Sequence, residues 1–271
     1  MTVDRDYVLG THDEELVRLG LQHRVWRPHA LRAWMAAGFT IGDTIVDVGC
    51  GPGHAALDLA EITGAGGRVV AVDRSRRFLT ALETAAAARG VRHIQTVECD
   101  LDRDPLPNVE ADGVWIRWVF AFVRQPKDLL SRAVRLLKRG GSIVVYEYFD
   151  YSTWRLAPRS EVFERFVNTV METWRAEGGE PDIALNLPAW FADEGMDIIS
   201  MKAIVDVVRR RDFIWQWPST FVTVGLARLV ELGRMSRDAA EETANEFARR
   251  ADDDRTVMMT PGVLEITARK R

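Results

Sequence analysis

A short apolar run that ends in a glycine-rich turn constrains the fold more than any other part of this sequence. It reads Val46-Asp47-Val48-Gly49-Cys50-Gly51-Pro52-Gly53-His54 and leads directly into Ala55-Ala56-Leu57-Asp58-Leu59-Ala60. The pattern predicts a buried strand, a tight turn and a helix. Glycine at three alternate positions allows positive φ and close approach of a ligand, and the first helical turn presents free N–H groups to that ligand. We therefore expect a nucleotide-sized binding site here.

The spacing of the glycines separates this turn from the dinucleotide-binding fingerprint. That fingerprint reads G-x-G-x-x-G and holds a pyrophosphate on the helix N-terminus. Here the spacing is G-x-G-x-G, and the acidic residue Asp47 precedes the turn. A carboxylate beside the turn repels a pyrophosphate but suits a cationic ligand. The spacing thus argues against an NAD-linked oxidoreductase, which we keep as an alternative.

Composition narrows the class of protein further. A chain of 271 residues with 47% hydrophobic content can bury a full core. The net charge is −4 and the basic residues are dispersed, so we expect no nucleic-acid partner. Cys50 and Cys99 lack metal-ligand spacing, which predicts reduced thiols and no metal site. No leader-like N-terminus and no run of transmembrane length are seen, so we expect no membrane insertion and a cytoplasmic protein.

Apolar runs and helical patterns alternate between residues 44 and 148. Strands are expected at 44–49, 68–73, 93–98, 113–119 and 142–148, with helices at 53–63, 76–89 and 126–137. This alternation predicts an α/β fold, a Rossmann-like and mostly parallel sheet with helices on both faces. Strands at 197–208 and 263–269 would complete seven strands. Ligands bind such sheets at the carboxyl ends of the strands.

The remaining segments are expected to be mainly helical. Residues 1–42 read as an N-terminal helical cap, with a helix over about 12–26 that Thr11 and Glu14 cap, and a second helix from Pro28 to Gly38. We expect residues 1–38 to act as a lid that the cofactor orders. Residues 43–271 form the main domain, with helical insertions at about 151–195 and 212–251. The insertions carry helices expected at 160–177, 188–195, 212–233 and 236–251.

Acidic residues follow the second and third predicted strands. Asp73 comes 20 residues after Gly53, where a carboxylate can accept hydrogen bonds from ribose hydroxyls. Its alternative role is to cap the helix that begins near Arg76. Asp100 ends the third strand, and its alternative is an ordinary turn residue.

The glycine-rich turn, the acids after the second and third strands and two later segments follow one another as in the class I S-adenosylmethionine (SAM) dependent methyltransferases. The sequence resembles in particular their small-molecule type of ubiquinone and menaquinone biosynthesis. The glycine-rich turn resembles their motif I, E/D-x-G-x-G-x-G. The run Asp112-Gly113-Val114 resembles their D-x-V segment, and Lys138-Arg139-Gly140-Gly141 resembles their K/R-P-G-G turn without its proline. The resemblance implies SAM-dependent methyl transfer to an apolar or aromatic small molecule, as in secondary metabolism. It leaves a homodimer open.

The resemblance also implies which residues contact the cofactor. Asp73 would bind the ribose and Asp100 the adenine amine, while Tyr7 and Gln22 would close over the cofactor. The full set is Tyr7, Gln22, Asp47, Gly49, Cys50, Gly51, Gly53, Asp73, Arg74, Asp100, Leu101 and Arg117. The N/D-P-P-Y/F signature is absent after the fourth strand, so methylation of a planar nitrogen in a base or a protein amide is disfavoured.

Two residues are candidates for catalysis. Arg117 could bind the cofactor carboxylate or an acidic acceptor in bidentate fashion, or could form an ion pair with Asp112 or Glu147. Tyr148, at the end of the fifth strand, is the candidate for handling an acceptor hydroxyl. We expect it to orient that group rather than to deprotonate it, because tyrosine ionises near pH 10.

Several interpretations stay open at this stage. His23 and His54 could be general bases, but a cap histidine and a helix-start residue are the better interpretations. We expect the acceptor pocket between residues 147–151 and the aromatic side chains at 154, 163, 166 and 174, which could equally be core. Trp154, Phe163, Phe166 and Trp174 are those side chains. A SAM-binding protein that does not methylate, either a cyclase or a silent subunit, is the second alternative, since fold does not fix function.

Overall fold

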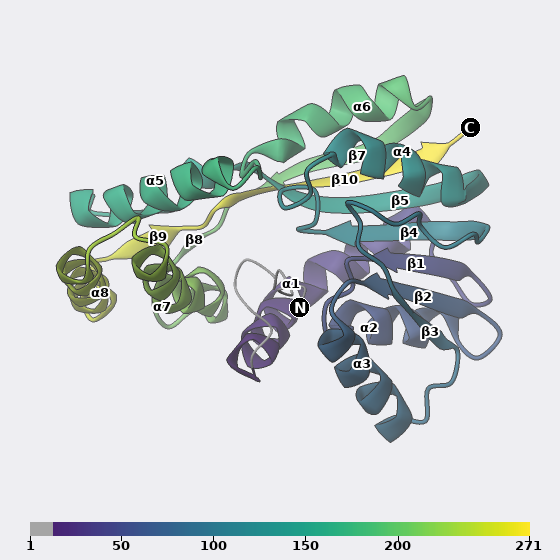
Figure 1. Ribbon diagram of the computed structural model, residues 1–271, viewed down its shortest axis with the longest axis horizontal. Coiled ribbons are helices and arrows are strands. Elements are labelled where there is room, and N and C mark those ends of the chain that lie inside the picture. Colours follow the sequence, from purple (N-terminus) through teal and green to yellow (C-terminus); the bar gives the residue numbers. More distant parts are fainter. Residues whose placement is uncertain (1–12) are drawn as a thin grey trace.

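A seven-stranded sheet runs through the protein in a computed structural model that describes residues 13–271 (Figure 1). Its strand order is β3-β2-β1-β4-β5-β10-β7, with β10 antiparallel to both its neighbours and the other pairs parallel. The strands are β1 (Thr44–Val48), β2 (Arg68–Asp73), β3 (Ile94–Glu98), β4 (Ala111–Arg117), β5 (Leu137–Asp150), β7 (Met196–Ile204) and β10 (Gly262–Lys270). The predicted Rossmann-like, mostly parallel sheet is confirmed.

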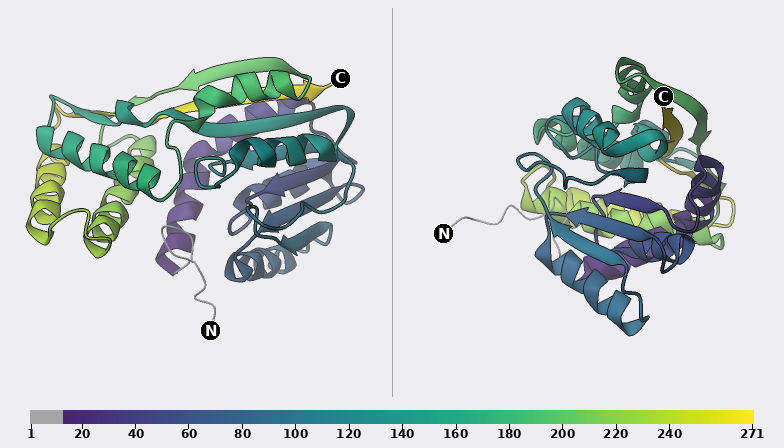
Figure 2. Two further views of the ribbon diagram at one scale, coloured as in Figure 1. Left: turned by 45° about the horizontal axis from the view of Figure 1, so that its top comes forward. Right: turned by 90° about the vertical axis from the view of Figure 1, so that its right-hand side faces the viewer.

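Helices cover both faces of this sheet (Figures 1 and 2). On one face lie α1 (Asp13–Ala37), α2 (His54–Thr63) and α3 (Arg76–Ala88), and on the other lie α4 (Pro126–Leu136) and α6 (Leu187–Asp193). The central strands are continuous apolar runs, as strands buried on both faces must be. In β5, for example, the residues from Ile143 to Tyr146 are all fully buried.

The N-terminal helix corrects one prediction. We expected a break at Pro28, but α1 continues through it. Pro28 and Arg24 both lie on the exposed side of the helix, so the carbonyl that loses its N–H partner faces water. On the opposite side, Trp26 and Trp34 are 2% and 0% exposed. Burial of these rings against the sheet outweighs the cost of the proline.

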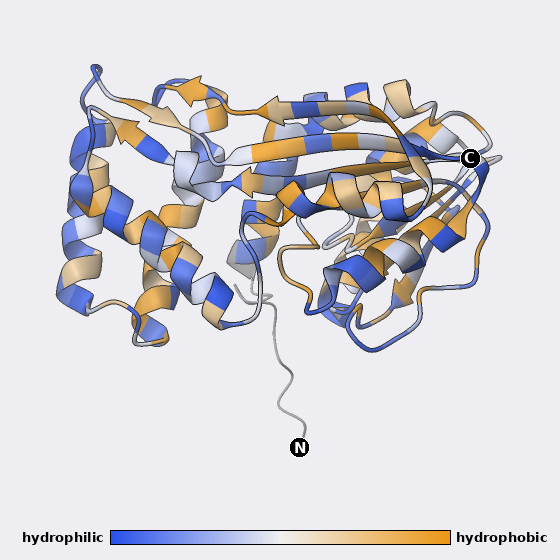
Figure 3. Ribbon diagram, turned by 90° about the horizontal axis from the view of Figure 1, so that it is seen from above, coloured by the Kyte–Doolittle hydropathy of each residue, from blue (hydrophilic) through white to orange (hydrophobic). Residues whose placement is uncertain are grey.

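The chain after β5 builds a second, largely helical part, which we call the lobe. It contains α5 (Glu161–Ala176), α7 (Gln216–Glu231) and α8 (Arg237–Ala251), beside a small sheet of β6 (Arg155–Ala157), β9 (Val257–Met259) and β8 (Val207–Val208). Hydrophilic and hydrophobic residues alternate along its helices (Figure 3), as amphipathic packing requires. Short 3-10 turns connect the elements, at η1 (Tyr151–Thr153), η2 (Ile183–Asn186) and η3 (Phe213–Trp215).

The expected strand at 197–208 is two strands in different sheets, which is a second correction. β7 ends at Ile204, and β8 pairs with β9 instead of β10. Between them the chain turns at Asp206, whose N–H donates to Thr260 Oγ1 at 3.0 Å while its carbonyl accepts from Thr260 N at 3.0 Å. The three-residue strands β6 and β9 were not expected, because so short a run carries no periodic signal.

Two negative findings apply to the described part of the chain. Among residues 13–271 no helix has the length and apolar character needed to cross a membrane. Within the same range, no cluster of three or more His, Cys, Asp or Glu side chains could hold a metal ion. Tyr7 and Thr11 lie outside the described residues.

Candidate functional site

The glycine-rich turn joins β1 to α2 at the carboxyl edge of the sheet. The N–H groups of Gly49 and Cys50 both donate to the carbonyl of Val72, at 2.8 and 2.9 Å, which ties the turn to β2. Gly51 has φ +55°, and a Cβ at this position would meet nothing within 4 Å. The backbone at Gly51 therefore borders open space, where a ligand can approach it closely.

The other two glycines of the turn are needed for packing. A Cβ on Gly49 would come within 2.4 Å of Val119 Cγ2, and one on Gly53 within 2.3 Å of Leu82 Cδ1. Cys50 lies buried between them, and burial raises the pKa of its thiol well above the usual value. These residues shape the turn, and Gly51 is the glycine of the three that faces open space.

Asp73 at the end of β2 holds the turn in place. Its Oδ2 accepts from the N–H of Gly51 at 2.8 Å, and its Oδ1 accepts from the N–H of Ser75 at 2.8 Å. Ser75, not Asp73, is the N-cap of α3, since its Oγ accepts from Phe78 N. Burial raises the pKa of Asp73. Its neighbour Arg74 is exposed.

The end of β3 lies beside Asp73, because Cys99 N donates to the Asp73 carbonyl at 3.0 Å. There Asp100 forms a turn: its Oδ1 accepts from Asp102 N at 3.0 Å. The side chain of Asp100 keeps 33% of its surface exposed. Leu101 is half-buried against the core. The structure thus brings the two predicted strand-end acids to one edge.

Two opposite charges are buried where β1 and β4 run side by side. Asp47 pairs in register with Trp115, so Asp47 and Arg117 project from the same face of the sheet. Burial raises the pKa of Asp47 to about 7, although Arg117 opposes this rise. Burial lowers the pKa of Arg117 to about 10, which leaves it charged at neutral pH. Asp47 Oδ2 and Arg117 Nη1 have no hydrogen-bond partner within residues 13–271.

Neither ion pair considered for Arg117 is present. Asp112 instead binds Lys138 Nζ at 2.7 Å and accepts from Thr44 N at 2.9 Å. Glu147 projects from the other face of the sheet, because Arg117 pairs in register with its neighbour Tyr146.

Glu147 is a buried carboxylate whose hydrogen bonds to the backbone after β4 were not expected from the sequence. Its Oε2 accepts from the N–H groups of Val119 and Phe120, at 2.9 and 2.8 Å. These bonds hold the chain where it leaves β4. Burial raises the pKa of Glu147 to about 8 despite them. The available signal was an acidic residue inside an otherwise apolar strand.

His23 links the N-terminal helix to the site. Its Nε2 lies 3.0 Å from Asp58 Oδ2, which also accepts from Arg27 Nε at 2.7 Å, and its Nδ1 lies 3.4 Å from Arg117 Nη2. Since arginine can only donate, we assign the proton of His23 to Nε2. Burial lowers the pKa of His23. It is a neutral, hydrogen-bonded histidine, as the structural interpretation expected.

Gln22 and His54 are the two neighbours of His23 in this part of the site. Gln22 is buried, and its Oε1 accepts from Arg18 Nη1 at 2.8 Å. His54 lies with its ring centre 5.7 Å from that of His23, and burial lowers its pKa to about 4. Both histidines therefore stay uncharged at neutral pH.

Tyr148 belongs to a cluster of aromatic rings on the α1 side of the sheet. Its ring centre lies 5.8 Å from that of Trp118 and 6.5 Å from that of Trp217. A cavity of about 20 Å³ adjoins it, which is room for little more than one water molecule. It is lined by Arg18, Gln22, Tyr148, Tyr151, Trp154, Trp217, Pro218, Phe221 and Pro261.

The aromatic residues expected around the acceptor divide into two groups. Phe163 and Phe166 are 0% exposed and pack on Trp154, with ring centres 5.2 and 5.7 Å away, so they are core of the lobe. Trp154 borders the cavity, while Trp174 packs against Tyr151 and Phe122. The sequence did not identify the residues of α7 that line this cavity, because nothing in it placed that helix over Tyr148.

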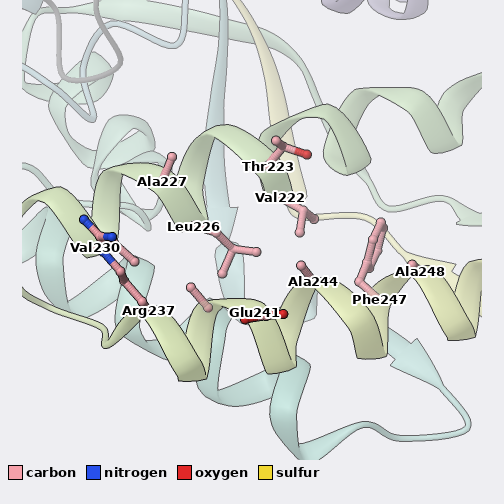
Figure 4. Close-up of a pocket in the computed structure, with 11 residues that line it drawn as sticks. Val222, Thr223, Leu226, Ala227, Val230, Arg237, Glu241, Ala244, Phe247 and Ala248 are labelled. Carbon is pink, nitrogen blue, oxygen red and sulfur yellow. The ribbon is translucent and has the colours of Figure 1, made fainter.

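A larger groove of about 630 Å³ lies between α7 and α8 (Figure 4). Apolar side chains such as Val222, Leu226 and Phe247 line it, with Arg237 and Glu241 at its edge. None of its lining residues comes from β1 to β5 or from α1. The groove is thus separate from the glycine-rich turn and from the candidate catalytic residues.

Comparisons with known proteins agree with this geometry. Residues 46–145 match the family model described as a methyltransferase domain. The ubiquinone/menaquinone biosynthesis C-methyltransferase UbiE of Pseudomonas fluorescens (strain SBW25) is 27% identical over 130 residues, which are 48% of this chain and 50% of the relative. The chain therefore spans about half the length of the curated relatives it matches.

Solved structures resemble most of the chain at low identity. The geranyl diphosphate methyltransferase in complex with SAM has a TM-score of 0.55 at 19% identity, covering 92% of this chain and 87% of the other. The [4+2]-cyclase SpnF has a TM-score of 0.56 at 17% identity, covering 88% and 79%. These likenesses show the fold. The match over residues 46–145 and the UbiE-type relatives make this part of the chain similar to the methyltransferase domain of class I SAM-dependent enzymes.

Proposed function

We propose that this protein transfers the methyl group of SAM to an apolar or aromatic small molecule. The observation that carries the proposal is the position of Arg117. Arg117 contacts His23 beside the glycine-rich turn and also contacts the aromatic cluster. Its guanidinium carbon lies 5.0 Å from the ring centre of Trp118. A cofactor over the turn and an acceptor against the rings would meet at this residue.

The residues of the turn fit SAM. Gly51 leaves room above the backbone, and Asp73 keeps lone pairs for ribose hydroxyls beside its two backbone bonds. Asp47 offers a buried carboxylate that complements the amino group of the methionine portion, and the charged Arg117 adds positive charge near its carboxylate. Further contacts that we propose come from Tyr7, Gln22, Gly49, Cys50, Gly53, Arg74, Asp100 and Leu101.

When bound, SAM supplies a methyl group on a sulfonium, a leaving group that is already activated. The protein then has to align the acceptor with that methyl group and exclude water. Holding the reacting atoms about 3–3.5 Å apart can contribute about 7–11 kcal/mol to the rate enhancement. Tyr148 orients the acceptor hydroxyl, so no strong base is needed.

Three experiments test the proposal. Calorimetric titration should show binding of SAM and none of NADH, and labelled SAM should transfer its methyl group to an acceptor from a panel of flat aromatic compounds. Tyr148→Phe should lower kcat with little change in SAM affinity. Tighter binding of NADH than of SAM would contradict the assignment.

A SAM-binding protein that does not methylate is the second candidate. The fold likeness to the [4+2]-cyclase SpnF favours it. A cyclase would convert its substrate without forming S-adenosylhomocysteine. Quantifying that product during turnover therefore separates the two functions.

The localisation, partners and assembly of the protein are also matters of proposal. We propose a cytoplasmic protein whose partner is a small-molecule acceptor, without nucleic acid. A homodimer would fit the outer strand β7, where Ile199 and Met201 are 48% and 52% exposed. Light scattering on the purified protein measures the assembly directly.

A further inference from the structure

Trp118, the first residue after β4, has a backbone conformation that residues other than glycine rarely adopt. Its φ is +53°, the one positive value at a non-glycine position in the described range 13–271. The surroundings enforce it: Trp118 N donates to the Tyr146 carbonyl at 2.9 Å, and the next two N–H groups bind the Glu147 carboxylate. Strain that the fold enforces in this way clusters at functional sites.

This conformation places the indole between the glycine-rich turn and the aromatic cluster. The next residue, Val119, packs directly on Gly49 of the turn. On the other side, the Trp118 ring centre lies 5.4 Å from that of Trp26 and 5.8 Å from those of Tyr148 and Trp217. A flat molecule that enters this cluster next to the cofactor therefore meets Trp118.

Trp118 and Arg117 bring two buried hydrogen-bond donors to this place. Trp118 Nε1 and Arg117 Nη1 are both buried, and neither has a hydrogen-bond partner in the part of the chain that the structure describes. The guanidinium lies against the face of the same indole. Buried donors without partners are rare and costly. A pair of donors of which one is cationic favours an ionised oxygen.

We propose that Trp118 Nε1 and Arg117 Nη1 together bind an ionised oxygen of the methyl acceptor, so that the acceptor is a flat aromatic phenolate or enolate. Trp118 is then a specificity-determining residue. The inference rests on the methyl transfer proposed above. It also explains why a strong base is unnecessary, since Arg117 favours the ionised form of the acceptor.

The chemistry balances without a further reactant. The acceptor oxygen, or a ring carbon conjugated with it, supplies the electron pair for the new bond to the methyl carbon. The bond between sulfur and methyl breaks, and its electron pair stays on sulfur. The negative acceptor and the positive sulfonium both become neutral. If a ring carbon is methylated, its proton passes to the oxygen by tautomerisation.

The experiment uses 4-nitrophenol, whose ionised form absorbs visible light. Calorimetry without SAM measures its affinity, and absorbance against pH measures whether the bound probe ionises at lower pH than the free probe. We expect the parent protein to lower the pKa of the bound probe. Trp118→Phe, which keeps an aromatic ring and removes the N–H, should weaken binding by about ten-fold or more.

Two controls isolate the N–H group. Nitrobenzene has the same ring without the hydroxyl, and Trp118→Phe should leave its affinity unchanged. Trp34 is a matched control residue: its buried Nε1 also lacks a partner among the described residues, but it packs on Trp115 in the core, with ring centres 5.1 Å apart. Trp34→Phe should leave binding of both probes unchanged.

The outcomes separate this inference from the proposed function. If SAM binds to the parent and to Trp118→Phe alike but nitrophenolate binds no better than nitrobenzene, the inference is overturned and the methyltransferase proposal stands. The same holds if nitrophenolate does not bind at all. If Trp118→Phe weakens SAM instead of the phenolate, the donors serve the cofactor carboxylate and the inference is wrong. If SAM does not bind to the parent, the proposed function fails.

Discussion

At the scale of single residues, side chains at the carboxyl edge of the sheet combine a place beside the glycine-rich turn with a structural role. The strand-end residues Asp47, Asp73 and Arg117 do lie at one edge, because parallel strands end together. However, Asp73 also holds the turn through Gly51 N, and Gly53 serves helix packing. Such roles depend on neighbours that are distant in the chain, so no local pattern contains them.

Gly51→Val should abolish SAM binding, because the side chain would occupy the open space over the turn and strain the backbone at positive φ. Gly90→Val is the matched control: Gly90 has φ +68°, and its Cβ would also meet nothing within 4 Å, but it ends α3 far from the turn. Calorimetry on both variants checks this. Equal SAM affinity in the two would contradict the placement of the cofactor.

Glu147→Gln should change how stability depends on pH. The pKa of Glu147 is raised to about 8 in the folded protein, against about 4.3 when unfolded. Between these two pH values Glu147 is protonated in the folded protein but ionised in the unfolded protein. Its contribution to the free energy of unfolding is therefore full below about pH 4 and is lost as the pH rises to about 8. The variant lacks this loss. Urea unfolding at pH 5 and pH 8 should show a smaller decrease for the variant, whereas parallel profiles would contradict the assignment.

At the scale of elements, helices and strands from β1 to α4 are predicted within a few residues, apart from the early start of β5. Glycine-containing turns separate the elements between β1 and α4, and the apolar runs of the strands there are long. The predictions fail where tertiary packing decides, as in the continuous α1 across Pro28 and the short strands β6 and β9. Whether residues 1–42 form a unit of their own stays a prediction, but α1 is joined to α2 through His23 and Asp58.

Asp58→Ala should destabilise the protein by about 3 kcal/mol, because it leaves the buried His23 N–H without its acceptor and removes the partner of Arg27. Arg27 is 43% exposed, so its share of this loss is the smaller one. Asp253→Ala removes an aspartate that also pairs with an arginine, Arg255, but at the surface. It should leave the unfolding midpoint unchanged. Equal effects of the two variants would show that the pair does not anchor α1.

At the scale of the whole molecule, β5 and β10 lie side by side in the main sheet and extend toward the lobe, so this pair of strands joins the two parts (Figure 1). The sequence predicted seven strands and inserted helices, but not that α7 would lie over Tyr148. The cavity there holds about 20 Å³, so we expect a movement of α1 or α7 when the proposed acceptor enters.

Hydrogen exchange should reveal whether α1 closes over the cofactor. If the N-terminal part of α1 closes over the cofactor, SAM should slow amide exchange in residues 13–24. Residues 237–251 of α8, which lie outside the candidate site, supply the internal reference and should not change. Equal exchange in residues 13–24 with and without SAM would contradict the lid.

The tryptophan cluster has an optical consequence. Trp26, Trp118 and Trp217 lie within 6 Å of one another, with one pair of rings nearly parallel and two nearly perpendicular. The strong far-ultraviolet transitions of indole couple at such spacing, so the folded protein should show a split signal in far-ultraviolet circular dichroism. An acceptor that separates the rings must collapse this signal. The protein therefore carries a built-in reporter of acceptor entry, which can screen candidate acceptors without label and without turnover.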